Sequence, residues 1–363
     1  MSRYIRFRDF DWQLFGLVLL ICALGVIEIY SATLHTKFEG MYMKQVYWIL
    51  AGVVLMFLFS FISYQVLIEN VPWMYGVAIV SLLAVLIFGK KYLGARRWID
   101  LHVFHFQPSE WVKLVLILAM AKYFADYQER ELPFREVVKV GLIVAIPMLM
   151  VLKQPDLGTS LTYVPIAVMA LFLGGLKWRH AVVVLLLAGV LMPAAWHYGL
   201  KPYQKERLTS FISPQADARG SGYQVIQSMV AVGSGGVWGK GIAKGTQTQG
   251  QFLPVPHTDF IFAAWSEEHG FVGACFVLLL YFLVLMRLIA NAQTAPDRAG
   301  AFLIMGVVAV LAFHVLVNVG MVVGFMPVTG IPLPLMSYGG SSVLFTFLAL
   351  GMVMNVQMRR FVN

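Results

Sequence analysis

The sequence predicts an all-α polytopic membrane protein with about ten transmembrane helices. Of its 363 residues, 60% are hydrophobic and 12% are charged, whereas an ordinary soluble domain is roughly a quarter charged. Apolar stretches of about 17–25 residues, the length that crosses a bilayer, can be placed ten times. We expect them at 12–30, 45–63, 72–89, 109–125, 137–153, 158–175, 180–197, 260–288, 299–325 and 335–356.

The flanking charges predict the orientation of these spans. An even number of spans places both termini on the same side, and cationic loops favour the cytoplasm. Both ends of the chain carry cations: Arg3, Arg6, Arg8, Arg359 and Arg360. We therefore expect cytoplasmic termini, an uncleaved signal anchor as the first span, and a large extracytoplasmic loop at 198–259, between spans 7 and 8. The net charge of +9 then reflects topology and anionic lipid rather than nucleic acid.

A cluster of two lysines and two arginines at 90–97 does not fit this orientation. It falls in a short external loop, whereas cations are favoured in cytoplasmic loops. Either the topology is inverted, or these cations hold an anionic group near the outer leaflet. We favour the second interpretation.

The external segment contains a glycine-rich stretch at 220–251, GSGYQVIQSMVAVGSGGVWGKGIAKGTQTQGQ. Its composition predicts irregular backbone that lies against the membrane or dips into it, which is tolerated where the chain is buried in protein or lines a wet cavity. A floppy linker is the alternative, but Tyr223 and Trp238 argue against free disorder. We expect this stretch to form the wall of a site.

The polar residues before the eighth span form the principal candidate site. Pro254 and Pro256 break any helix, and His257, Thr258 and Asp259 follow directly before an apolar run. Thr258 or Asp259 suits the N-cap of the next helix, because a side-chain oxygen can accept an unpaired backbone N–H. A capped helix start is the plain explanation, and a reactive carboxylate is the alternative.

Charged groups inside a bilayer are costly, so each one is a functional candidate. Glu110 and Lys113 are three residues apart and share a helix face. Either they form an internal ion pair, or Glu110 orients the Lys113 ammonium toward a substrate phosphate. Gln154 and Asp156 flank Pro155 and chiefly indicate a helix start, with Asp156 as the cap.

Other polar positions have structural explanations. Glu28, near the outer end of the first span, is expected to reach headgroups, and His314 and Asn318 share a face suited to interhelical hydrogen bonds. The segment 327–342, PVTGIPLPLMSYGGSS, could leave backbone amides free to bind an anion. It could equally form a tight turn before close helix packing.

Five motifs together resemble the SEDS family (shape, elongation, division and sporulation) of bacterial peptidoglycan glycosyltransferases. They are QPSEWVKL, QPDLGTS, GSGYQVIQS, GTQTQGQFLPVPHTDFIFAAWSEEHGFVG and LPLMSYGGSS, in family order. The segments YQKERLTSF and GKGIAKGTQTQGQFLP are similar to the elongation branch, and the division branch is the close alternative. Elongation members usually carry a Glu directly after the FLP triplet, where this chain has Val255.

The resemblance implies one SEDS membrane domain over 1–363 and a lipid II substrate. Lipid II would be polymerised into β-1,4-linked glycan by inverting transfer, with release of undecaprenyl diphosphate. Asp259 matches the family's proposed catalytic position and is the expected general base. The expected substrate- and diphosphate-binding residues are Arg96, Arg97, Glu110, Lys113, Gln154, Asp156, Arg207, His257, Thr258, Ser337, Gly339, Gly340 and Ser341.

The resemblance also implies partners and a location. The partners are a class B penicillin-binding protein, which is a transpeptidase, and other membrane proteins of the elongation complex. The location is the bacterial cytoplasmic (inner) membrane, with the active site on the extracytoplasmic side. A divalent cation, Mg²⁺ or Mn²⁺, is an open question, because no ligand spacing identifies a metal site. A lipid II flippase and a non-catalytic scaffold of a cell-wall synthase are the alternative functions.

Overall fold

The computed structural model describes residues 9–92, 95–100, 105–127, 129, 131–217 and 220–360. Helices dominate this part of the chain. In order they are α1 (Trp12–Thr33), α2 (Met41–Phe61), α3 (Tyr64–Glu69), α4 (Val71–Phe88), α5 (Pro108–Asp126), α6 (Phe134–Lys153), α7 (Leu157–Leu161), α8 (Tyr163–Leu173), α9 (Trp178–Ala194), α10 (Pro202–Ile212), α11 (Ser221–Ser234), α12 (Thr246–Gln249), α13 (Ile261–Gln293), α14 (Arg298–Val322) and α15 (Gly340–Met358).

Among the described residues, six helices are long and apolar enough to cross a membrane: α1, α2, α4, α13, α14 and α15. The chain is thus a helical polytopic membrane protein. A helix or a helix pair lies at each of the ten expected stretches, with α7 and α8 together filling the sixth. The count of ten crossings stays a prediction, because several of these helices are short or carry charges.

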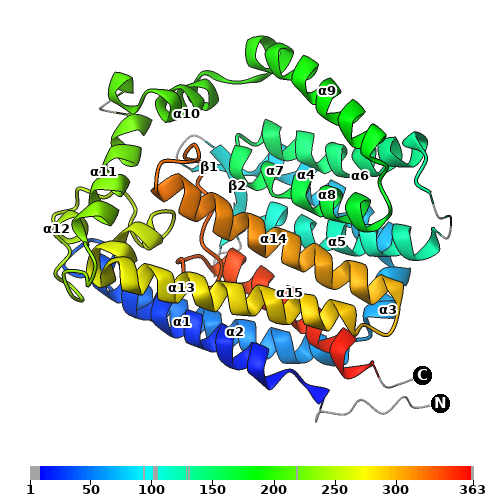
Figure 1. Cartoon of the computed structure of the whole chain (residues 1–363), viewed down its shortest axis with the longest axis horizontal. Coiled ribbons are helices and arrows are strands. Elements are labelled where there is room, and N and C mark those ends of the chain that lie inside the picture. The colour runs from blue at the N-terminus through cyan, green and yellow to red at the C-terminus, as the bar shows by residue number, and fades with distance from the viewer. Residues whose placement is uncertain are drawn as a thin grey trace.

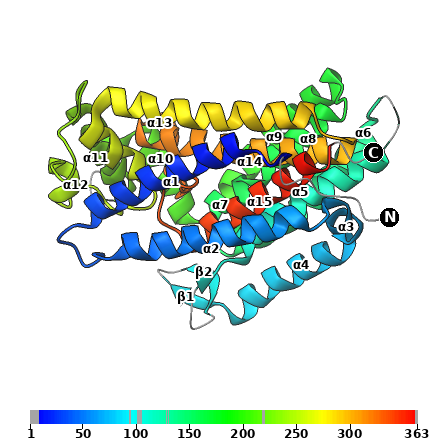
Figure 2. The same cartoon turned by 90° about the horizontal axis from the view of Figure 1, so that it is seen from below.

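Of the six, α15 is the most enclosed; it packs mainly on α2 and also contacts α5 and α14 (Figures 1 and 2). By contrast, α4 exposes large apolar side chains such as Trp73 and Phe88. A soluble protein rarely exposes so much apolar surface, whereas lipid tails would cover it. α1 begins and α15 ends at one end of the bundle, while α11 and α12 lie at the other (Figure 2).

The prediction of an all-α fold is wrong at 90–106. This segment forms a small antiparallel sheet of β1 (Lys90–Tyr92), β2 (Ala95–Asp100) and β3 (His105–Phe106), with β2 in the centre. In a strand, successive side chains point to opposite faces, so the sequence pattern of a strand repeats every two residues. The strands were missed because they are short and contain charged residues, whereas the prediction looked for long apolar stretches.

The glycine-rich stretch at 220–251 is also more regular than predicted, because its first half forms α11. Its second half packs backbone against backbone on the first turns of α13. A Cβ at Gly235 would lie 2.1 Å from the Ser266 carbonyl oxygen, and one at Gly239 would lie 2.1 Å from that of Glu268. The glycines are required there by close contact with α13.

α13 is broken at Gly270, whose φ of 67° and ψ of −165° are not helical. The break frees two amides that bond to the glycine-rich segment: Phe271 N donates to Gly236 O at 2.9 Å, and Val272 N to Val237 O at 3.1 Å. The break therefore joins α13 to the segment that follows α11.

We expect Gly270→Ala to prevent correct assembly of this junction. An alanine Cβ would lie 2.3 Å from Gly239 N and 2.6 Å from Val237 O, and this backbone region costs a non-glycine residue about 1–3 kcal/mol before any clash. The folded yield after detergent extraction, measured by size-exclusion chromatography, should fall severalfold. Gly141→Ala, on the open face of α6 with no atom near the added Cβ, is the matched control. Equal yields of the two variants would contradict this account.

Candidate active site

Asp259 lies directly before α13 and is not its N-cap. The N-cap is Phe260, and no side chain caps this helix start, so the predicted capping by Thr258 or Asp259 is wrong. The backbone is held instead by Asn318 of α14, whose Nδ2 donates to Asp259 O at 2.9 Å and to Ile331 O at 2.8 Å. The Asp259 side chain is left available for another role.

Three charged residues from separate elements act electrostatically on the Asp259 carboxylate: Arg97 of β2, Arg207 of α10 and Asp156 before α7. The carboxylate lies over the backbone of Gly330, where an added Cβ would be 3.4 Å from its Oδ2. Arg207 Nη1 donates to Thr329 O at 3.2 Å. The site thus joins four parts of the chain that are distant in sequence.

Burial raises the pKa of Asp259 to about 6, although the attraction of Arg207 and Arg97 lowers it in part and the nearby Asp156 raises it further. Among the described residues, none donates a hydrogen bond to this carboxylate. A general base works best when its pKa lies near the working pH. The environment therefore suits Asp259 to accept a proton near neutrality.

Arg97 and Asp156 are fixed by one another and by the start of α7. The Arg97 guanidinium donates to Pro155 O and lies 3.8 Å from Asp156 Oδ1. Asp156 caps α7 by accepting from Thr159 N at 3.2 Å, as predicted, and it also accepts from Gln107 Nε2 at 3.1 Å. The side chain of Arg96 lies outside the described residues.

Glu110 and Lys113 form the expected ion pair, with 2.9 Å between Oε2 and Nζ. The Lys113 ammonium also lies 3.3 Å from His314 Nε2 and 4.2 Å from the centre of the Phe345 ring. Its side chain is 0% exposed. A direct contact with a substrate phosphate does not fit this enclosed ammonium. The pair instead supports His314, whose Nδ1 lies 3.2 Å from Pro332 O, two residues beyond Gly330.

Three other predicted residues make their contacts with parts of the chain other than the Asp259 carboxylate. Gln154 Nε2 donates to Leu82 O of α4 at 3.0 Å. His257 is buried against Phe38, and burial lowers its pKa to about 4, so the ring is neutral at pH 7. Thr258 Oγ1 donates to Val255 O at 3.4 Å. Within the described residues, neither the His257 nor the Thr258 side chain is hydrogen-bonded to the Asp259 carboxylate.

The residues at 337–339 form a packed turn that leads into α15, whose start has no side-chain cap. Ser337 Oγ donates to Thr258 O at 2.7 Å, and Gly339 N donates to Gln45 Oε1 at 3.3 Å. Gly340 and Ser341 open α15, and a Cβ at Gly340 would lie 2.7 Å from the Trp48 ring. Close helix packing, the alternative considered for 327–342, is what the structure has here.

Sequence reasoning missed Thr329 and Gly330, which support the carboxylate and Arg207. The signal was present in PVTGIP, where a glycine lies among prolines, and Gly330 has the positive φ of 74° that glycine adopts readily. Gln107, which holds Asp156, was also missed.

Comparison with known proteins shows the family to which the chain belongs. Residues 11–361 match the sequence model of the FtsW/RodA/SpoVE family, described as cell cycle protein. The chain therefore belongs to this family.

Individual relatives cover nearly the whole chain. The peptidoglycan glycosyltransferase MrdB of Escherichia coli (strain K12) is 39% identical over 88% of this chain and 86% of its own length. Stage V sporulation protein E of Bacillus subtilis (strain 168) is 36% identical over 95% and 96%. The crystal structure of RodA from Thermus thermophilus has a TM-score of 0.73 and 32% identity, covering 98% of each chain. A structure described as showing how a peptidoglycan synthase complex coordinates polymerization and crosslinking has a TM-score of 0.84 and 36% identity, covering 98% of this chain and 99% of the other.

Two places in the described residues offer carboxylates to a cation. Asp259 and Asp156 lie in one site, and Mg²⁺ is commonly held by one or two carboxylates together with substrate phosphates. This donor set fits such an ion when a diphosphate supplies the remaining oxygens. The second place is Glu28, Glu268 and His269. The expectation that Glu28 reaches headgroups is wrong, because its side chain is 0% exposed and faces α13.

Proposed function

We propose that the chain is a peptidoglycan glycosyltransferase that polymerises lipid II, with Asp259 as the general base. The observation that carries the proposal is the Asp259 carboxylate over Gly330, next to Arg207, where burial raises its pKa to about 6 and Arg97, Arg207 and Asp156 act on it electrostatically. The relatives MrdB of Escherichia coli and RodA of Treponema pallidum are both named peptidoglycan glycosyltransferases. Their names also support a role in cell elongation.

In the proposed reaction Asp259 accepts the proton of the attacking sugar hydroxyl. The hydroxyl oxygen bonds to the anomeric carbon of the donor as its bond to the diphosphate breaks, so the configuration inverts and a β-1,4 linkage forms. Undecaprenyl diphosphate leaves with the electron pair. Diphosphate is a good leaving group, so a second carboxylate is not needed as an acid. A bound divalent ion, if used, would add positive charge beside the departing phosphates.

Arg97 and Arg207 would bind the diphosphate, because an arginine fork matches phosphate oxygens. Their charge stabilises the negative charge that develops on the leaving group. Glu110 and Lys113 take a positioning role instead, through His314 and the backbone at 332.

We further propose a class B penicillin-binding protein and other elongation-complex membrane proteins as partners. One structural neighbour comes from a peptidoglycan synthase complex that coordinates polymerization and crosslinking, and a transpeptidase supplies crosslinking. The proposed location is the bacterial cytoplasmic membrane with Asp259 on the extracytoplasmic side, within a single membrane domain that includes the segment 198–259.

The direct test is glycan-chain formation from purified lipid II. The wild-type protein is assayed alone and with a class B penicillin-binding protein whose active serine is disabled, and products are separated by gel. Polymer in either arm supports the transferase. Absence of polymer in both arms would favour a flippase or a non-catalytic scaffold, and lipid translocation would then be measured.

Removal of either arginine is expected to impair transfer and to change its pH dependence. Arg207→Ala and Arg97→Ala should each lower kcat/KM by about 10²–10³-fold, as for the loss of one donor to a developing oxyanion. Each arginine lowers the pKa of Asp259, so the acidic limb of the pH–rate profile should move to higher pH. Lys201→Ala, an exposed cation of the same segment, is the control. Wild-type rates and profiles in both arginine variants would refute the diphosphate assignment.

A further inference from the structure

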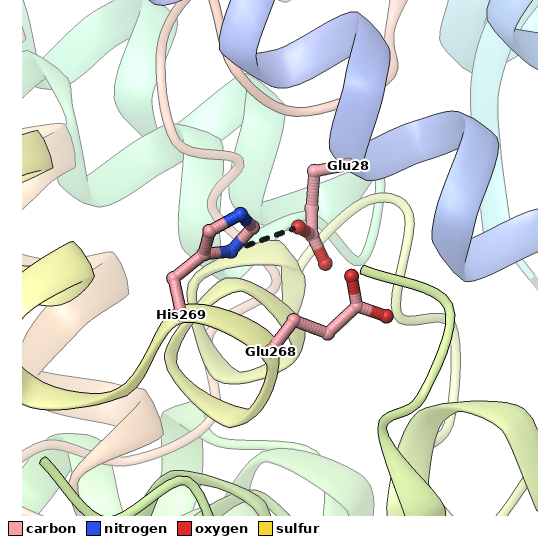
Figure 3. Close-up of side chains that lie close together, drawn as sticks. All are labelled: Glu28, Glu268 and His269. Atoms are coloured by element: carbon pink, nitrogen blue, oxygen red, sulfur yellow. Dashed lines mark ion pairs between the residues drawn. The ribbon is translucent and has the colours of Figure 1, made fainter. Parts of the chain in front are cut away.

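A second cluster of ionisable groups lies apart from Asp259, where α1 meets the break in α13. Glu28 of α1 points toward Glu268 and His269 of α13 (Figure 3). One oxygen from each carboxylate and one nitrogen from the imidazole all lie within 4.8 Å of one another. Glu28 Oε2 is 3.9 Å from His269 Nδ1.

The cluster has buried carboxyl oxygens without a partner. Glu28 is 0% exposed, and neither of its oxygens accepts a hydrogen bond within the described part of the chain; the same holds for Glu268 Oε2. The nearby cation Lys240 is already paired with Glu267 at 2.8 Å. Burying a carboxylate without a partner is strongly unfavourable, so the cluster requires a cation or a proton.

The surroundings hold the three side chains in place. Ser31 Oγ donates to Glu268 Oε1 at 2.5 Å and accepts from Ala243 N at 3.0 Å. The imidazole of His269 stacks on Trp265 with 3.7 Å between ring centres. Its Nδ1 lies 3.3 Å from the Trp265 carbonyl oxygen, and in the tautomer that donates from Nδ1 to this oxygen, Nε2 is the nitrogen left to bind an ion. Metal ligands are commonly oriented by such outer contacts. The side chains of Glu28, Glu268 and His269 are thus held in place, while the unpaired oxygens of Glu28 and Glu268 remain available to bind a ligand.

We propose that Glu28, Glu268 and His269 bind one divalent transition-metal ion, Zn²⁺ or Mn²⁺. Two carboxylate oxygens and one imidazole nitrogen are donors that suit these ions. The bound ion would join α1 to α13 just before Gly270. Glu268 is seven positions beyond Ile261 along the helix, which is a rise of about 10 Å at about 1.5 Å per residue. The ion is therefore separate from any ion at Asp259, and its proposed role is to hold α1 and α13 together.

The test measures metal binding by the full-length protein in detergent, independently of transferase activity. The protein is stripped with EDTA, desalted, and incubated with Zn²⁺ or Mn²⁺. Bound metal is then determined by mass spectrometry and the Tm is recorded. We expect one ion per chain and a higher Tm for the wild type. Glu28→Gln and His269→Gln should each weaken binding at least tenfold and abolish the increase in Tm.

Two control variants keep the outcome specific. Glu39→Gln removes an exposed carboxylate just after α1, and Asp259→Asn removes the carboxylate of the candidate active site; both should bind the ion as the wild type does. If the wild type binds no ion, or if Glu28→Gln and His269→Gln bind as tightly as the wild type, the proposal is wrong. Absence of binding together with a higher Tm of Glu28→Gln would indicate a proton shared between the two carboxyl groups.

Discussion

Asp259→Asn is expected to abolish glycan polymerisation while the protein remains folded and membrane-inserted. A general base contributes about 10²–10⁴-fold to a rate, and the amide of Asn cannot accept the proton. The Asp259 side chain caps no helix, and the Asn318 bond to its backbone oxygen is kept. Polymer is measured from purified lipid II beside the wild type, and size-exclusion profiles serve as the folding control. Equal polymer from both proteins would exclude Asp259 as the base.

The pH dependence provides a second measure of the same residue. Activity should rise as the pH passes through about 6, because the ionised form of Asp259 is the base. The stability effect has the opposite sign. A carboxyl with a raised folded-state pKa contributes stability below its unfolded value of 3.8, and this contribution is lost as pH rises through about 6. At pH 7 the Asn variant should therefore be at least as stable as the wild type, as judged by Tm.

Lys113→Ala is expected to cause a large loss of stability. It leaves Glu110 buried without its partner and removes the contact with His314. Removing one member of a buried ion pair costs about 3–5 kcal/mol. We expect a clear fall in Tm and a loss of polymerisation that follows the loss of folded protein.

A double variant separates pairing from substrate contact. Glu110→Gln with Lys113→Met removes both charges, and should recover more than half of the lost stability, because no unpaired buried charge remains. Lys139→Ala is the matched control. It breaks a pair with Glu136 at the same spacing, but with Lys139 45% exposed, so about 1 kcal/mol or less is expected. If Lys113→Ala has the Tm of the wild type but uses lipid II poorly, the substrate-contact role first expected for Lys113 is restored.

Local features were predictable from the sequence. The capping of α7 by Asp156 and the ion pair of Glu110 with Lys113 each involve residues three apart in the chain. The positions of the long apolar helices followed from the length of chain needed to cross a bilayer. Asp259 was identified as a candidate from its neighbours and from the family resemblance.

Features that depend on distant contacts were not predictable. The burial of Glu28 against α13 arises from a helix that is distant in the sequence. The small sheet pairs strands of one segment, and it was missed because those strands are short and charged. The N-cap of α13 was misplaced because Asn318, from another helix, fixes the backbone at Asp259.

The sequence by itself determined a helical membrane protein of a recognisable family, because hydropathy and short motifs depend only on residues that are neighbours in the chain. Tertiary structure decided which charges meet. Arg97, Arg207 and Asp156 act electrostatically on Asp259 from three other elements, whereas Lys113 is enclosed with Glu110 and His314. The reason is physical. The pKa of a carboxyl group and the accessibility of an ammonium depend on burial and on charges that folding brings near. These distances cannot be read from a single sequence.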